Sequence, residues 1–313
     1  FVFINIQGTK SYKRTLLPMM YLMFALGFIV IISGLLFDQN DFIDSLYRTE
    51  SRVIEPILEK SFDWKIFLTA STLMFSSFIG FDAIAQTGNE AKNPTKNIPR
   101  AILLAIFIVS LYYILFTISV YNIVPWNFIA DESLTKDITA PGLLSYVLPP
   151  FWGILIIIGA AIALINDLPA MILSVSRLMF AWSKDNIFPE KISEIHPKFN
   201  TPHRAIIYVG IVASIGAFGS HFAGDFFLGI DIMVTAMMIN FLLMCITLIS
   251  IKRVNPTLYN KITIIKNRTI QVLIGFIGSI IILIFLVIHT FKDLSSNVDG
   301  WYFHSTYIYL IVM

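Results

Sequence analysis

Seven apolar stretches recur along the chain, and each is long enough to cross a bilayer as an α-helix, which takes about 20 residues. They cover residues 16–37, 66–88, 101–125, 151–176, 205–224, 226–251 and 269–291, and an eighth candidate runs over 301–313. Backbone polar groups in hydrocarbon must be paired within a helix or a closed barrel, and none of these stretches alternates as a barrel strand does. The sequence therefore predicts an all-α polytopic membrane protein.

The composition favours burial in lipid over a soluble fold. Of the 313 residues, 57% are hydrophobic and 13% are charged, whereas a soluble domain carries about 25% charged residues. The single cysteine, Cys245, excludes a disulfide framework and a thiolate metal cluster. No histidines stand at a metal-binding spacing, no glycine-rich phosphate loop is present, and no basic cluster points to nucleic acid.

The distribution of Lys and Arg predicts the orientation in the membrane. Alternate loops carry 16 of these residues, and the intervening loops carry 6. Because basic residues collect on the cytoplasmic side, the first set should face the cytoplasm. These loops are 7–14, 90–100, 177–204 and 252–268.

The second stretch combines a glycine and an acid near its centre, Gly80 and Asp82. In one interpretation Gly80 breaks the helix, and Asp82 caps the helix that restarts by accepting from its free N–H groups. In the other, the break lines a cavity, because unwound backbone at membrane depth is tolerated only there and forms substrate sites in secondary transporters. Both interpretations can hold together.

Three motifs resemble those of the amino acid–polyamine–organocation (APC) permeases. The segment FIGFDAIAQTGNEAKNPTKNIPRAI, at 78–102, is similar to the sixth-helix signature of that family. The segment SRLMFAWSKDNIFPEKISEIHPKFNTPHRA, at 176–205, is similar to its loop between helices eight and nine. The segment NIQGTKSYKR, at 5–14, is similar to its turn between helices four and five. The motifs stand in the order and spacing of the family.

The resemblance implies a leucine-transporter-type fold of two inverted repeats with five helices each. The chain would then be part of a longer permease, with helices five to twelve present and the N-terminal helices missing. Residues 1–313 would form one transmembrane domain, with 1–37 ending the first repeat, 66–251 forming the second, and 269–313 supplying accessory helices.

The same resemblance implies a substrate site at the break. Its residues would be Phe75, Ser76, Phe78, Ile79, Gly80, Phe81 and Asp82. The carbonyls of Ile79 and Gly80 would bind the substrate's ammonium group. Some family members carry an aromatic lid where Ser76 stands, so here either Phe75 or Phe78 takes that role or both simply pack.

Asp167 is the candidate for ion or proton coupling, together with Asn166. An ionisable group within a span is costly and is a functional hypothesis by default. The neighbourhood Ile165–Asp167 lacks the hydroxyls of a sodium site, and Met23 stands about where some family members place a proton-linked lysine. The alternatives are an acid paired with a group outside this chain, or an acid beside a Pro169 kink.

Other acids and bases fall near the ends of spans. Glu90, Arg177 and Asp185 are candidates for a cytoplasmic gate, and Asp231 is either an interfacial or a gate acid. The loop at 183–204 mixes apolar and charged residues and predicts a short helix on the membrane surface.

Together these features predict a secondary active transporter of amino acids, working by alternating access. Proton-coupled symport is the leading expectation, and an amino acid/amine exchanger or a non-transporting membrane sensor of the same fold are the alternatives. We expect no enzymatic activity, cofactor or metal, and a proton or sodium as the coupling ion. The expected partners are an amino acid or related amine and the lipid bilayer of the plasma membrane, without nucleic acid.

Overall fold

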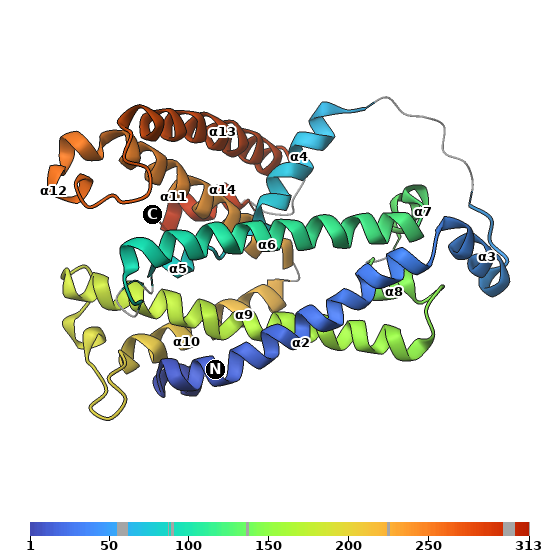
Figure 1. Ribbon diagram of the computed structural model, residues 1–313, viewed down its shortest axis with the longest axis horizontal. Helices are drawn as coiled ribbons and strands as arrows, with labels where there is room; N and C mark the ends of the chain where they lie inside the picture. Colours follow the sequence, from blue (N-terminus) through green and yellow to red (C-terminus); the bar gives the residue numbers. More distant parts are fainter. Residues whose placement is uncertain are drawn as a thin grey trace. The chain divides into compact units, whose positions relative to one another are not determined.

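The computed structural model describes residues 1–54, 62–86, 88, 91–135, 138–223, 226–296 and 304–312 (Figure 1). Within these ranges the regular elements are helices, and no strand is present. Among the described residues, six helices are long and apolar enough to cross a membrane, namely Lys10–Leu36, Trp64–Gln86, Pro94–Ile123, Pro150–Lys184, Gly229–Val254 and Arg268–Leu294. The predicted all-α polytopic class is therefore confirmed.

The remaining two predicted spans also correspond to helices. The stretch predicted at 205–224 is helix α10, His203–Ala223, whose described apolar part is His203–Gly219. The candidate at 301–313 contains α14, Ser305–Val312, and its other residues lie outside the described ones apart from His304.

The chain divides into two compact units. The first comprises residues 1–60 and 105–209, and the second comprises 61–104 and 210–313. This is a division by spatial contact, so the predicted division into repeats stays a prediction. Helices α6 and α10 contribute to both units.

The first unit contains α1 (Val2–Ile6), α2 (Thr9–Leu36), α3 (Gln39–Glu50), α7 (Trp126–Glu132), α8 (Ala140–Leu144), α9 (Pro150–Lys184) and the 3₁₀ turn η3 (Glu190–Ser193), with most of α6 (Pro94–Ile123). Helix α2 lies along α9, and the two cross where Gly159 meets Leu26 (Figure 1). A buried cluster that includes Phe42, Leu46 and Phe128 joins α3 and α7 to the ends of these long helices.

Helices α2 and α6 approach each other closely at Gly34 and Ser119. A Cβ on Gly34 would overlap both the Cα and the Cβ of Ser119. Two hydrogen bonds hold the helices together here: Asn122 Nδ2 donates to the Gly34 carbonyl at 2.9 Å, and Ser119 Oγ donates to the Ile31 carbonyl at 3.3 Å. Small residues commonly allow such backbone contact between membrane helices.

Replacing Gly34 by alanine is expected to destabilise the protein by about 1–3 kcal/mol, because the added methyl must displace backbone rather than a flexible side chain. Thermal unfolding of the purified protein in detergent measures this effect. Gly153→Ala is the matched control, since a Cβ there has no atom within 4 Å. Equal melting temperatures for the two variants would contradict the prediction.

Helix α3 begins with a capping box. The Asp38 carboxylate accepts from the backbone N–H groups of Asn40 at 2.8 Å and Asp41 at 3.1 Å, and the Asp38 N–H donates to the Asp41 carboxylate at 3.0 Å. The hydrogen bond from the Asp41 N–H, followed by those from Asn40, lowers the pKa of the Asp38 carboxyl below its ordinary value.

This lowered pKa predicts an acid-sensitive contribution to stability. A carboxyl with a depressed folded-state pKa stabilises the fold above its unfolded pKa, and the contribution is lost as the pH falls through the folded value. We expect Asp38→Asn to remove that part of the acid dependence while keeping an oxygen that can cap α3. Melting temperatures of the two proteins, measured from neutral to acidic pH, should converge in acid. Parallel curves would refute the prediction.

The second unit contains α4 (Trp64–Met74), η1 (Phe75–Phe78), α5 (Ala83–Gln86), α11 (Phe226–Val254), α12 (Pro256–Tyr259), α13 (Arg268–Leu294) and α14, with parts of α6 and α10. Helices α11 and α13 pack closely, since a Cβ on Gly275 would lie 3.0 Å from the Cys245 carbonyl oxygen. Arg268 of α13 donates to the Leu248 carbonyl of α11 at 2.9 Å.

Polar contacts join α11, α13 and α14 near the ends predicted to face outward. Asp231 of α11 lies 3.5 Å from Lys292 of α13, so the Lys292 ammonium group partly neutralises its charge. Asp293 accepts from the backbone N–H groups of Ser305 at 3.0 Å and Thr306 at 2.9 Å, at the start of α14. Of the two interpretations of Asp231, these contacts favour an interfacial acid.

Candidate functional site: a broken helix and a polar cavity

The predicted break in the second span is present. Helix α4 ends at Met74, the 3₁₀ turn η1 follows, and α5 begins only at Ala83. Between them Ile79 is extended, and Gly80 has φ +123°, in a region that residues with a Cβ rarely adopt. A Cβ on Gly80 would have no atom within 4 Å. The backbone conformation at position 80, rather than crowding, therefore requires glycine.

The backbone groups at the break differ in their hydrogen bonding. The Gly80 carbonyl accepts from the Ala83 N–H at 3.1 Å, which closes a tight turn. The Ile79 carbonyl accepts no backbone hydrogen bond from the described residues. Of the two carbonyls predicted to face the substrate, that of Ile79 is the more available, although a carbonyl oxygen has two lone pairs and Gly80 can accept again.

Asp82 is buried, and its carboxylate accepts from the Gly80 N–H at 3.3 Å. The hydrogen bond that the structure describes for Asp82 thus runs back into the break, and it does not by itself support the interpretation of Asp82 as the cap of the restarting helix. The reason is local: the N–H groups of Ile84 and Ala85 already donate to the Phe81 and Asp82 carbonyls, at 3.3 and 2.9 Å. This hydrogen bond of Asp82 stabilises the break.

The aromatic residues around the break share one partner on α11. The ring of Phe241 stacks on Phe81, with centroids 5.3 Å apart and planes at 18°, and meets Phe75 edge-on at 5.9 Å. Phe78 remains 37% exposed, whereas Ser76 donates to the Leu73 carbonyl within its own turn at 2.7 Å. Phe75 therefore packs against α11, and of the two lid candidates Phe78 is the more exposed.

Sequence reasoning missed Phe241. It lies in a predominantly apolar span, where no motif marks one phenylalanine as functional.

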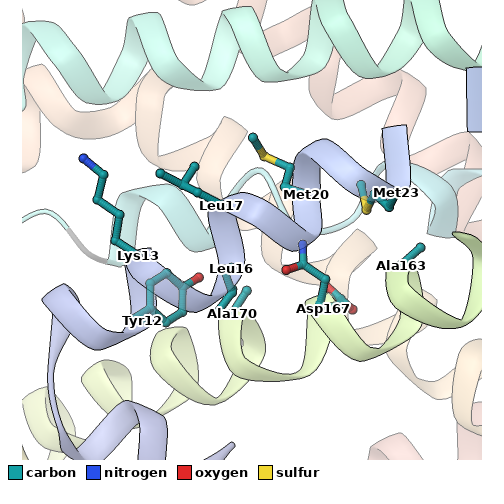
Figure 2. A pocket seen from close by; sticks show the side chains of 10 residues that line it. Tyr12, Lys13, Leu16, Leu17, Met20, Met23, Ala163, Asp167 and Ala170 are labelled. Atoms are coloured by element: carbon teal, nitrogen blue, oxygen red, sulfur yellow. The ribbon is translucent and has the colours of Figure 1, made fainter. Parts of the chain in front are cut away.

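Asp167 lines a cavity of about 610 Å³ between α2 and α9, in the first unit (Figure 2). Tyr12, Met20 and Met23 extend into it from α2, and Asn166 joins Asp167 on α9. The Asn166 side-chain oxygen is buried, and no described residue donates a hydrogen bond to it. The cavity is thus lined by a carboxylate next to an amide, an arrangement that suits a proton, a cation or a bound donor.

The centre of α9 is also bound by α1. Asn5 Nδ2 donates to the Pro169 carbonyl at 3.2 Å, across 164 residues of sequence. Thr201 Oγ1 donates to the Ile6 carbonyl at 2.8 Å, and Gly8 turns the chain with φ +90°. The motifs at 5–14 and 176–205 therefore contact each other, which places the turn before α2 against the loop after α9.

The candidate gate residues do not form one described cluster. Arg177 donates to Ser176 Oγ at 3.2 Å, and Asp185 is the C-cap of α9, about 12 Å further along the helix at 1.5 Å per residue. Glu90 lies outside the described residues. In the loop after α9, the predicted surface helix is the single turn η3, and Arg204 pairs with Glu194 at 2.7 Å.

Among the described residues, no three His, Cys, Asp or Glu side chains form a group that could hold a metal ion.

Comparisons with known proteins agree with the motif resemblance. The amino acid permease family matches residues 1–313. A branched-chain amino acid permease of Bacillus subtilis (strain 168) is 27% identical over 52% of this chain and 36% of its own length. A methylthioribose transporter of the same strain is 30% identical over 48% of this chain and 31% of its own. The vacuolar cationic amino acid transporter 4 of Arabidopsis thaliana is 29% identical over 48% of this chain and 24% of its own length.

These matches cover about a third or less of each relative's length. The names are those of permeases and transporters rather than enzymes. With the family match over its whole length and six membrane-length helices in its described part, the chain belongs to the amino acid permease family as a multi-pass membrane protein.

Proposed function

We propose that this protein is a secondary active transporter of amino acids that works by alternating access about the break at Gly80. The observation that carries the proposal is the helix interruption itself, which leaves the Ile79 carbonyl without a backbone donor among the described residues. A carbonyl freed at membrane depth needs a partner, and the ammonium group of a substrate supplies one.

The side chains at the break support a neutral amino acid as substrate. We take Phe75, Phe78, Ile79 and Phe81, the apolar residues of the break, as the proposed wall of the site. The acid of the same segment, Asp82, already accepts the Gly80 N–H. A cationic side chain would leave its charge without a free carboxylate in this wall, which is costly in a low-dielectric site. The relatives include both a branched-chain amino acid permease and a cationic amino acid transporter. An apolar wall favours substrates with apolar side chains over substrates with cationic ones.

The coupling ion in this proposal is a proton carried by Asp167. Asn166 lines the cavity beside Asp167, and its buried oxygen has no hydrogen-bond partner among the described residues, while Met23 lines the cavity from α2. Sodium is the less suited ion because residues 165–167 supply no hydroxyl. Glu90, Arg177 and Asp185 remain proposed gate residues, and the plasma membrane is the proposed location, with the basic loops in the cytoplasm.

The test uses the full-length protein in liposomes that contain only buffer. Uptake of a labelled mixture of neutral amino acids is followed with and without an inward pH gradient, and again after preloading with unlabelled amino acids. Accumulation that requires the gradient is the expected result. Uptake only after preloading would identify an exchanger, and amino acid binding without uptake would identify a sensor. Neither uptake nor binding would refute the proposal.

A further inference from the structure

Phe241 is the one described side chain whose ring contacts the broken helix on both sides of Gly80. Phe75 is the first residue of η1, before the break, and Phe81 follows it directly. Phe241 packs edge-on against the first and stacks on the second, and it is 8% exposed. All three residues belong to the second unit.

The segments that flank the break are short. Both η1 and α5 are four residues long, and η1 continues directly from α4. Because the helical hydrogen bonds are interrupted between η1 and α5, the angle between them depends on packing against other elements. The hydrogen bond from Gly80 to Asp82 fixes the turn locally, but it does not join the turn to α4.

Helix α11 provides a firm base for such a contact. It packs against α13 at Gly278, where a Cβ would lie 2.9 Å from Cys245 Sγ, and Arg268 donates to the carbonyls of Leu248 and Ile249. Phe241 is thus presented to the break from a helix that is itself tightly held.

We infer that Phe241 is a positioning residue for transport, whose ring sets the angle of the broken helix at Gly80 and so the direction of the Ile79 carbonyl. The inference rests on the proposed function and adds to it a residue on α11. A change of angle at Gly80 moves Phe75 and Phe81 relative to each other, so Phe241 can keep both ring contacts in only a narrow range of angles. Aromatic pairs have this preference because their quadrupoles favour stacked or edge-to-face geometry.

The test compares Phe241→Leu, which removes the ring, with Phe241→Tyr, which keeps it. Met238→Leu is the matched control, because Met238 is fully buried on the same helix one turn earlier. Initial uptake rates in liposomes give KM and the maximal rate, and melting temperatures report the fold. We expect Phe241→Leu to raise KM about 2- to 10-fold above the parent value. Phe241→Tyr and Met238→Leu should each keep the KM of the parent protein.

A second measurement does not depend on transport. In a Cys245→Ser background, the rate at which a thiol reagent modifies Ile79→Cys reports how firmly the break is held. We expect Phe241→Leu to raise this rate and Met238→Leu to leave it unchanged. An unchanged KM and an unchanged labelling rate in Phe241→Leu would overturn the inference. If the parent protein transports nothing, the proposed function fails, and the labelling rates alone decide the role of Phe241.

Discussion

Replacing Gly80 by alanine is expected to abolish amino acid uptake. The residue sits at φ +123°, and a residue with a Cβ held in such a conformation costs about 1–3 kcal/mol. The break can avoid this cost only by changing its backbone angle, which moves the Ile79 carbonyl and breaks the bond from the Gly80 N–H to Asp82. Uptake of labelled amino acids into liposomes, normalised to the amount of folded protein, is the measurement.

Gly216→Ala is the matched control for this experiment. Gly216 lies in α10 within the same unit, a Cβ there also has no atom within 4 Å, and its φ is ordinary. Alanine should therefore be tolerated at 216 and not at 80, and the difference isolates the backbone conformation. Full uptake by Gly80→Ala would mean that the break is not the transport site.

Replacing Asp167 by asparagine is expected to abolish accumulation driven by a pH gradient while sparing exchange. Asparagine keeps the size of the side chain but cannot carry a proton between the two sides of the membrane. Exchange of external for internal amino acid requires no net proton movement, so counterflow should continue. Parallel uptake assays, one with a gradient and one with preloaded liposomes, measure the two activities.

Two further variants sharpen this test. Asp131→Asn, at an exposed acid of α7, should behave like the parent protein. Met23→Lys should lose the response to the gradient as Asp167→Asn does, because a lysine in the same cavity favours the charged form of Asp167. Gradient-driven accumulation that survives in Asp167→Asn would assign Asp167 a structural role.

The positions of the spans, and of the break within one of them, followed from the sequence alone. Lipid permits only internally paired backbone, so an apolar run of about 20 residues without the alternation of a barrel strand is expected to form a helix. A glycine followed by an acid inside such a run is an equally local signal, and Gly80 adopts the conformation that glycine permits.

The partners of the functional side chains were decided by the tertiary structure. Nothing near Asp82 in the sequence predicts that its carboxylate turns back to Gly80, since that depends on which N–H groups the turn leaves unpaired. Asn5 contacts Pro169 across 164 residues, and Phe241 contacts the break from a span whose sequence carries no motif that marks it. The physical reason is the sequence separation over which each effect acts. Hydropathy and backbone preference act within one segment, whereas ring stacking and side-chain hydrogen bonds between helices form only after those helices have packed.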